Sequence, residues 1–310
     1  MLLKLIFAAS SLVLSAANSP FCRPKNDFLD EYENIIHPSY ERIIRGKPES
    51  KGHFGAVYFC KVNGVDSAVK VVSTVKDSQM NIALNEKRMA NILAATPGVV
   101  VPYGCFFERN KVAFWMLKKG PSFSKLLRHF KTLSFHRKLD VFIMLAENLH
   151  ELHRSYVIHN DLKPANILAR NRHFSDVYLI DFGCACLAGE TCYGGTKVYS
   201  PPEKLNGKLR AHGEYSLDVW SFLIMVIVLY SGATSDHIAT IFSSRDQGCW
   251  SHMTVSCYTF FIKKLTVALR SAPAWFTRVV MSGLRYTPSK RPSMALVVKR
   301  LHAGRRSAFG

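Results

Sequence analysis

The chain has 310 residues, of which 48% are hydrophobic and 12% aromatic, and this excludes a wholly disordered protein. Forty-one Lys and Arg against 22 Asp and Glu give a formal net charge of +19, which favours anionic partners such as nucleotides or acidic proteins. The basic residues are scattered, and only residues 299–306 approach a cluster. We therefore expect no specific nucleic-acid binding.

The first 17 residues have the layout of a secretory signal peptide. Lys4 precedes an apolar run from Leu5 to Leu14, and small residues follow at positions 15–17. This run is too short for a comfortable membrane span, so no transmembrane span is expected. The alternative to a signal peptide is a hydrophobic N-terminal extension that docks on the domain or anchors it peripherally.

Eight cysteines occur without a repeating interval. Cys184 and Cys186 are the tightest pair, and no CxxC or His–Cys set of the kind that binds zinc accompanies them. We interpret the cysteines as free thiols in a reduced compartment. Because this interpretation favours cytoplasm or nucleus and the N-terminus favours the secretory route, the localisation stays open.

The coarse pattern changes once along the chain. Residues 18–40 contain prolines and charges typical of a linker, and residues 41–117 alternate short β-rich runs with one helical stretch at 77–95. Beyond residue 122 the pattern is mostly helical, including residues 134–153 and 216–232. The run from Phe222 to Tyr230 is apolar nearly all round but about half the length of a membrane span, which predicts a central buried helix.

Two stretches suit phosphate chemistry at the N-terminal end of the domain. In "SKGHFGAVY", residues 50–58, Gly52 and Gly55 lack side chains and let the backbone approach phosphate oxygens closely. "SAVKVV" places Lys70 on a predicted strand, and Glu86 follows sixteen residues later on the predicted helix.

Two further stretches bring together residues that phosphoryl transfer requires. "HNDLKPANIL", residues 159–168, contains Asp161, Lys163 and Asn166, and "LIDFGCA" places Asp181 twenty residues after Asp161. Oxygen side chains such as those of Asn166 and Asp181 are the ligands that Mg²⁺ accepts beside phosphates and water.

In this order, the pieces resemble the signature set of the protein kinases, over about residues 41–303. The resemblance implies an α+β fold, the bilobal protein-kinase fold. It would have a small β-rich N-lobe with one main helix (about 41–117) and a larger, mostly helical C-lobe (about 122–304). The kinase domain would span 41–304, before a basic tail at 305–310.

The resemblance also implies structural contacts beyond the lobes. "GTKVYSPPE", residues 195–203, resembles the end of the family's activation segment, whose Glu203 should pair with Arg291. Asp218 matches the residue that ties down the backbone of the catalytic loop.

Roles for the site residues follow from the same resemblance. Asp161 would accept the proton of the substrate hydroxyl, Lys163 would neutralise the γ-phosphate, and Asn166 and Asp181 would bind Mg²⁺. The residues expected to contact ATP or to position its contacts are Ser50, Lys51, Gly52, His53, Phe54, Gly55, Val57, Ala68, Lys70, Glu86, Leu117 and Leu168.

Finer motifs resemble one class of kinase. "DLKPAN" and Thr196 are similar to the Ser/Thr class, and "GTKVYSPPE" and "AHGEYSLDVWS" are similar to the constitutively active Pim-type kinases. The implied activity is that of an ATP-dependent serine/threonine protein kinase. One alternative is a pseudokinase that binds nucleotide or acts as a scaffold, in which Ser50, in place of the first glycine, and Asn160 would mark the decay of the enzyme. The other is a kinase of small molecules or lipids.

Two departures from the family pattern carry predictions. Asn160 stands where the family has an Arg that pairs with an activation-segment phosphate, and a neutral amide cannot make that contact. We therefore expect activity without phosphorylation of Thr191 or another activation-segment residue. Lys125 and Arg128 stand where Pim-type kinases have acidic residues, beside Lys118 and Lys119, and this predicts acidic or neutral protein substrates rather than Arg-directed ones.

Overall fold

The computed structural model describes residues 22–23, 47–52, 55–62, 65–108, 110–232 and 252–309. It divides into two compact units, the first Met1–Ala95 with Val100–Lys118 and the second Thr96–Val99 with Lys119–Gly310. The predicted signal peptide lies outside the described residues. So does the predicted linker, except for Cys22–Arg23, which form strand β1 and pair in parallel with β5.

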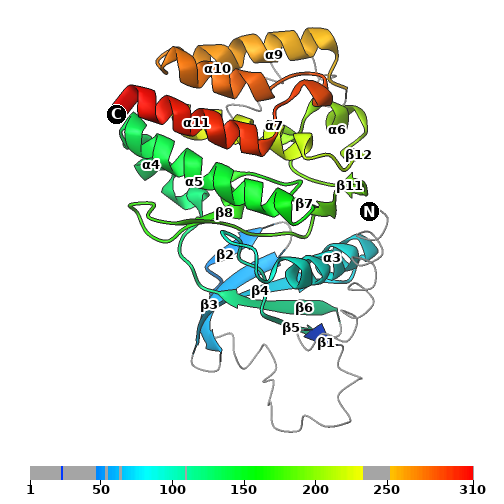
Figure 1. Ribbon diagram of the computed structural model, residues 1–310. Coiled ribbons are helices and arrows are strands. Elements are labelled where there is room, and N and C mark those ends of the chain that lie inside the picture. Colours follow the sequence, from blue (N-terminus) through cyan, green and yellow to red (C-terminus); the bar gives the residue numbers. More distant parts are fainter. Residues whose placement is uncertain are drawn as a thin grey trace, which may run out of the picture. The chain divides into compact units, whose positions relative to one another are not determined.

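Among the described residues, the first unit contains a six-stranded sheet and one helix (Figure 1). The strand order is β1-β5-β6-β4-β3-β2, and every pair other than β1–β5 is antiparallel. The strands after β1 are β2 (Ser50–Gly52), β3 (Gly55–Val62), β4 (Val65–Ser73), β5 (Gly104–Glu108) and β6 (Lys111–Leu117). Helix α3 (Asp77–Leu93) packs alongside β4 and buries Ala83, Met89 and Leu93. The small, mostly antiparallel sheet accompanied by a helix, as expected from the sequence, is confirmed.

The second unit is mostly helical. Its α-helices are α4 (Phe123–Lys131), α5 (Phe135–Arg154), α6 (Pro202–Asn206), α7 (Ser216–Ser231), α9 (Val255–Ala268), α10 (Ala274–Gly283) and α11 (Met294–Phe309). Short 3₁₀ turns occur at η3 (Pro164–Asn166), η4 (Lys197–Tyr199) and η5 (Pro288–Lys290). Three antiparallel strand pairs join β7 (Val157–Ile158) to β10 (Cys186–Leu187), β8 (Ile167–Ala169) to β9 (Val177–Leu179), and β11 (Thr191–Tyr193) to β12 (Arg210–His212).

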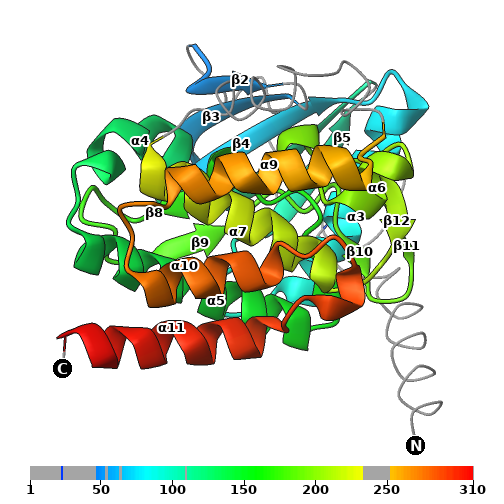
Figure 2. The ribbon, with the colours of Figure 1, turned by 90° about the horizontal axis from the view of Figure 1, so that it is seen from above.

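Helix α7 forms the centre of the second unit, as its apolar sequence predicts. Every residue from Leu217 to Leu229 is buried, and α5, α9 and α10 pack around it (Figure 2). Gly232 ends the helix with φ 68°, a left-handed conformation that glycine adopts without penalty. None of the helices in the described ranges combines the length and apolar character needed to cross a membrane.

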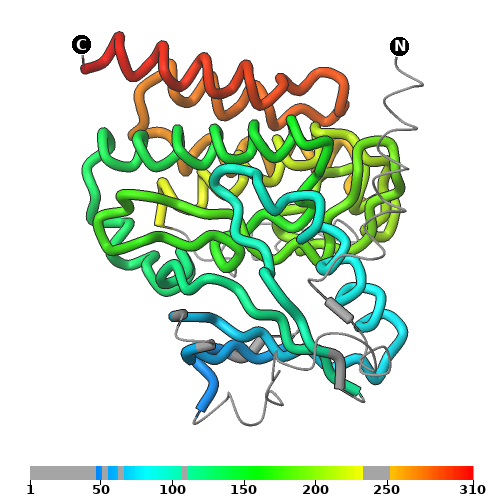
Figure 3. The backbone as a smooth tube through the Cα atoms, turned by 60° about the horizontal axis from the view of Figure 1, so that its bottom comes forward, coloured from blue at the N-terminus to red at the C-terminus, as the bar shows by residue number. Residues whose placement is uncertain are grey.

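The last helix, α11, runs alongside α5 (Figure 3). Residues 305–309 of the predicted basic tail continue this helix. The Arg305 Nε lies 2.7 Å from Asp140 Oδ1 on α5, so this end of the chain is attached to the helical unit by charge as well as by packing.

A buried arginine joins α6 to the C-terminal part of the unit. The guanidinium of Arg291 donates to both carboxylate oxygens of Glu203 at 2.6 and 2.8 Å, and to backbone carbonyls of Arg285 and Ser216 at 2.8 and 3.1 Å. Two parallel N–H···O bonds to one carboxylate stabilise the pair and also fix its geometry. The predicted Glu203–Arg291 ion pair is confirmed.

Candidate active site

The first unit contributes an ion pair between strand β4 and helix α3. Lys70 Nζ lies 2.7 Å from Glu86 Oε2, and both residues are almost fully buried. Val57 lies directly opposite Lys70 on the neighbouring strand, and Ala68 is two residues before it, so the three share one face of the sheet. The predicted Lys70–Glu86 pair is confirmed. Leu117 pairs with Ser67, and strand alternation therefore puts its side chain on the opposite face.

The glycine-rich stretch forms a hairpin between β2 and β3, with Ser50 opposite Val57 and Gly52 opposite Gly55. Gly55 has φ 145°, and a Cβ at this position would overlap the carbonyl oxygen of Val71, so only glycine fits. His53 and Phe54, two of the residues predicted to contact ATP, lie outside the described residues.

In the second unit, a fully buried carboxylate anchors the catalytic loop. Asp218, in the first turn of α7, accepts hydrogen bonds from the backbone N–H groups of His159 and Asn160 at 2.7 and 2.8 Å. It also lies 3.0 Å from His153 Nε2. Burial alone would raise its pKa, but the hydrogen bond and charge of His153, together with the charge of His159 and the backbone N–H of Asn160, lower the pKa below the ordinary value. The predicted contact between Asp218 and the loop backbone is confirmed.

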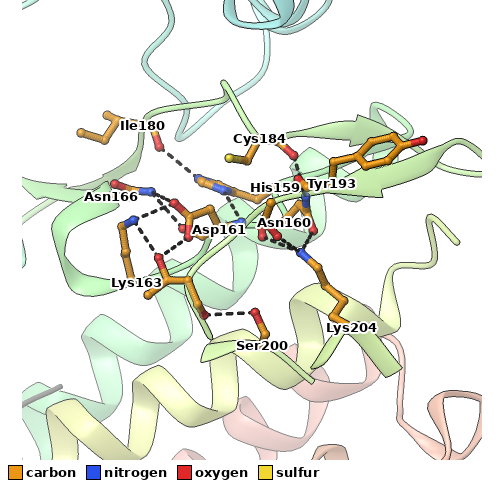
Figure 4. Close-up of polar contacts among 12 residues, drawn as sticks. His159, Asn160, Asp161, Lys163, Asn166, Ile180, Cys184, Tyr193, Ser200 and Lys204 are labelled. Carbon is orange, nitrogen blue, oxygen red and sulfur yellow. Dashed lines mark hydrogen bonds and ion pairs between the residues drawn. The ribbon is translucent and has the colours of Figure 1, made fainter. Parts of the chain in front are cut away.

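Three donors orient the carboxylate of Asp161 (Figure 4). Lys163 Nζ lies 2.7 Å from Oδ2, and the side-chain amide of Asn166 donates to the same oxygen at 3.2 Å. The hydroxyl of Thr196 donates to Oδ1 at 2.7 Å and accepts from Lys163 at 2.9 Å. These contacts bring Asp161, Lys163 and Asn166 together as the sequence indicates. Thr196 contacts both Asp161 and Lys163, as its resemblance to the threonine of the Ser/Thr class implies.

Asn166 and Asp181 provide oxygen atoms suited to a magnesium ion. Both amide hydrogens of Asn166 point at Asp161, to its carbonyl at 2.9 Å and its carboxylate at 3.2 Å, which leaves Oδ1 as the atom to meet a cation. Its backbone carbonyl accepts from the N–H of Ile180 at 3.1 Å, next to Asp181. The described residues hold no cluster of three or more His, Cys, Asp or Glu side chains around one point. Mg²⁺ fits such a site because it keeps water and phosphate oxygens as its other ligands.

Comparison with known proteins agrees with this arrangement. The family described as protein kinase domain matches residues 50–302. The chain belongs to the protein kinase family. Over 285 residues it is 28% identical to serine/threonine-protein kinase D2 from Homo sapiens, covering 84% of this chain and 30% of that protein. Over 215 residues it is 32% identical to serine/threonine-protein kinase D3 from Mus musculus, covering 64% and 23%.

A third relative comes from a plant. The mitogen-activated protein kinase kinase SIPKK from Nicotiana tabacum is 27% identical over 216 residues, covering 65% of this chain and 59% of that protein. This chain therefore spans less than two thirds of the length of all three relatives.

The kinase domain contains a contact that sequence reasoning missed. Lys204, on α6, is 1% exposed and donates to the side-chain oxygen of Asn160 and to the carbonyl of Gly194 (Figure 4). The side-chain amide of Asn160 in turn donates to the carbonyls of Cys184 and Tyr193 at 2.7 and 2.8 Å. Lys204 stands among prolines and a surface-type glutamate in "SPPEKL", where no pattern distinguishes a buried lysine from an exposed one.

The cysteines correct another expectation. Cys186 and Cys192 form a disulfide, and Cys105 and Cys257 are also disulfide-bonded, so the prediction of free thiols is wrong for these four. Cys60 and Cys184 are free. Disulfides form and persist in oxidising environments, which removes the cysteine argument for a reduced compartment. Burial raises the pKa of Cys184 to about 11, and a thiol with so little thiolate is unreactive.

Replacing Asp218 should lower the free energy of unfolding by an amount that depends on pH. Asp218→Asn puts an amide group where two carboxylate oxygens accept hydrogen bonds, and we expect a loss on the order of 3 kcal/mol at pH 7. Because the folded pKa of Asp218 lies below the ordinary value of 3.8, its contribution is present above that pH and is lost as the pH falls further. Urea unfolding at steps down to about pH 3 should therefore show the difference between wild type and variant shrinking below about pH 4.

The matched control is Asp176→Asn, which removes a half-exposed carboxylate of the same unit that pairs with Arg170. It should leave unfolding within about 0.5 kcal/mol of wild type. If the difference in unfolding free energy between wild type and Asp218→Asn stayed constant over the whole pH range, the stabilising role of the ionised Asp218 carboxylate would be contradicted.

Proposed function

We propose that this chain is an ATP-dependent serine/threonine protein kinase that transfers the γ-phosphate of ATP to protein hydroxyls. The observation that carries the proposal is the Asp161 carboxylate, held by Lys163, Asn166 and Thr196. The similarity to the serine/threonine-protein kinases D2 and D3 supports the serine/threonine class. The Pim-type resemblance rests on the sequence motifs alone.

The catalytic loop would act through position and charge. Asp161 would accept the proton of the substrate hydroxyl, because a carboxylate with its orientation fixed by three donors is a suitable general base. Lys163, 2.7 Å from that carboxylate, would offset negative charge that develops on the transferred group. Thr196 bonds to both residues and would hold them in register.

ATP would supply the phosphoryl group, with Mg²⁺ balancing its charge. In the first unit, Lys70 would bind phosphate oxygens while Glu86 fixes its rotamer, and Gly52 and Gly55 would permit close backbone approach. In the second unit, Asn166 and Asp181 would hold the metal. The remaining residues proposed at the nucleotide are Ser50, Lys51, His53, Phe54, Val57, Ala68 and Leu168. Leu117, whose side chain lies on the opposite face of the sheet, would contact the nucleotide only through its backbone.

Asp161→Asn should abolish most of the transfer. We expect the rate of phosphate incorporation from radiolabelled ATP and Mg²⁺ into protein substrates to fall by about 10²–10⁴-fold, because the amide cannot accept the proton. Asp176→Asn serves as control, since it removes a carboxylate of the same unit outside the site.

Two other outcomes identify the competing functions. A wild-type protein that binds ATP but transfers nothing would be the pseudokinase. Incorporation into small hydroxyl compounds or lipids, with none into protein, would indicate the third possibility.

The substrate preference is proposed from exposed positive charge on α4. Lys125 and Arg128 are both exposed there, and basic side chains repel a basic peptide. A degenerate peptide library should return acidic or neutral residues before the phosphorylated position. The double variant Lys125→Glu/Arg128→Glu should shift the selection towards basic peptides. An Arg-rich consensus from the wild type would refute the preference.

The oxidised cysteines support folding in an oxidising compartment, and we propose the secretory route on that basis. Non-reducing digestion and mass spectrometry of protein from secreting cells should detect a peptide pair linked through Cys186 and Cys192. Free thiols at both positions in an active preparation would contradict the proposal.

Independence from phosphorylation of Thr191 is proposed from its surroundings. Thr191 is exposed on β11, and Asn160, which stands at the position of the family's phosphate-binding Arg, already bonds to Cys184, Tyr193 and Lys204. A side chain whose donors and acceptor are engaged in this way has no need of a phosphate partner.

A further inference from the structure

A buried lysine lies between the catalytic loop and the residues that follow "DFG". Lys204 is 1% exposed, and its ammonium group meets three oxygens: the side-chain oxygen of Asn160, the carbonyl of Gly194 and, at 3.5 Å, the carbonyl of Asn160. An ammonium carries three N–H donors, so the group can serve all three acceptors. A buried charge is costly unless it is compensated in this way.

Asn160 is the junction of the network. Its side-chain amide donates to Cys184 and Tyr193, which lie near the two ends of the segment 184–196. Its backbone N–H is held by Asp218, and its φ of 66° is a left-handed value that Asn tolerates better than most residues. The backbone nitrogen of Asn160 thus connects the loop to α7, its amide nitrogen connects the loop to the segment 184–196, and its side-chain oxygen connects the loop to α6.

Gly194, whose carbonyl accepts from Lys204, lies two residues before Thr196, which bonds to the carboxylate of Asp161. Gly195 follows with φ 97°, and a Cβ there would come within 2.6 Å of the Asn160 carbonyl and 2.9 Å of Lys204 Nζ. The next residue, Thr196, donates to Asp161 Oδ1 at 2.7 Å. A shift of Gly194 would therefore move the hydroxyl that orients Asp161.

The charge of Lys204 is sensitive to pH. Burial lowers its pKa to about 8, although Cys184, Asp161, Asp218 and Glu203 favour the charged form. At pH 7 the ammonium form dominates. As the pH rises through this pKa, the group loses both its charge and one of its three donors.

We propose that Lys204 is a positioning residue: through Asn160 and Gly194 it holds the segment 184–196 on the catalytic loop and keeps Asp161 aligned without a phosphate on that segment. The inference rests on the proposed kinase activity for its kinetic test, but its structural part can be measured independently. In this proposal Lys204 provides the positive charge beside Asn160.

The test compares four full-length proteins: wild type, Lys204→Met, Lys208→Met and Thr191→Ala. Met fills the space of the lysine stem without donating, and Lys208, four residues on, is exposed. At pH 7 we expect Lys204→Met to lower kcat on the order of 10- to 100-fold, the size of effect that misplaced catalytic groups produce, with KM for ATP unchanged. Lys208→Met and Thr191→Ala should match wild type.

Two readouts separate positioning from mere structural support. The kcat of wild type should fall above about pH 8, while Lys204→Met should lack this alkaline decline because it has no group to titrate. Amide hydrogen exchange at pH 7 should be faster in residues 184–196 of Lys204→Met and unchanged in α5 and α11.

The outcomes distinguish failure of the positioning role of Lys204 from failure of the proposed kinase activity. Wild-type kcat and pH profile in Lys204→Met would overturn the positioning role, as would loss of activity in Thr191→Ala. If Lys204→Met fails to fold, a wild-type kcat that is flat through pH 8 would overturn it equally. If wild type transfers no phosphate, the proposed function fails, and unchanged exchange in residues 184–196 of Lys204→Met would then overturn the inference on its own.

Discussion

The geometry of the catalytic loop depends on one buried carboxylate, that of Asp218. A fully buried charge without partners would be strongly destabilising, so its three donors are a condition of folding and not an addition to it. Two of those donors are consecutive backbone N–H groups, of His159 and Asn160. Binding both to one side chain fixes the backbone at Asn160, immediately before Asp161, and the loop that follows is built from this point.

From Asn160 the network divides in two directions. Along the chain it leads to Asp161, which bonds to Lys163, Asn166 and Thr196. Through the side chain it leads to the segment after "DFG" and to Lys204 on α6. An amide suits this position because it offers two donors and an acceptor at once, whereas an Asp side chain would lack the donors and an Arg the acceptor.

Sequence reasoning succeeded where a contact follows from a family motif with fixed spacing. The pairs Lys70–Glu86 and Glu203–Arg291 and the contact of Asp218 with the loop were expected on that ground, and the structure contains them. It failed where the outcome depends on burial. Nothing local to Lys204 distinguishes it from exposed lysines of this basic chain, because its burial results from the packing of α6 against the loop.

The disulfide and strand β1 are further contacts that depend on tertiary packing and not on a local sequence pattern. Cys186 and Cys192 flank a turn that contains Gly189, and a six-residue separation around a glycine was the one available signal for their disulfide. The disulfide also requires β10 and β11 to lie close together, which no local pattern reveals. Likewise Cys22–Arg23 joined the sheet from a stretch whose composition is that of a linker.

Disulfide and lysine restrain the segment 184–196 in different ways. The disulfide closes a ring from Cys186 to Cys192 and so reduces the conformational freedom of those residues. Thr196, which bonds to Asp161, lies four residues beyond that ring. The N–H of Gly194 donates to the carbonyl of Leu209, and its own carbonyl accepts from Lys204. These two hydrogen bonds fix the position of Gly194 between the disulfide ring and Thr196. The covalent link can therefore make the segment compact, but alignment with the carboxylate of Asp161 requires the non-covalent contacts around Gly194.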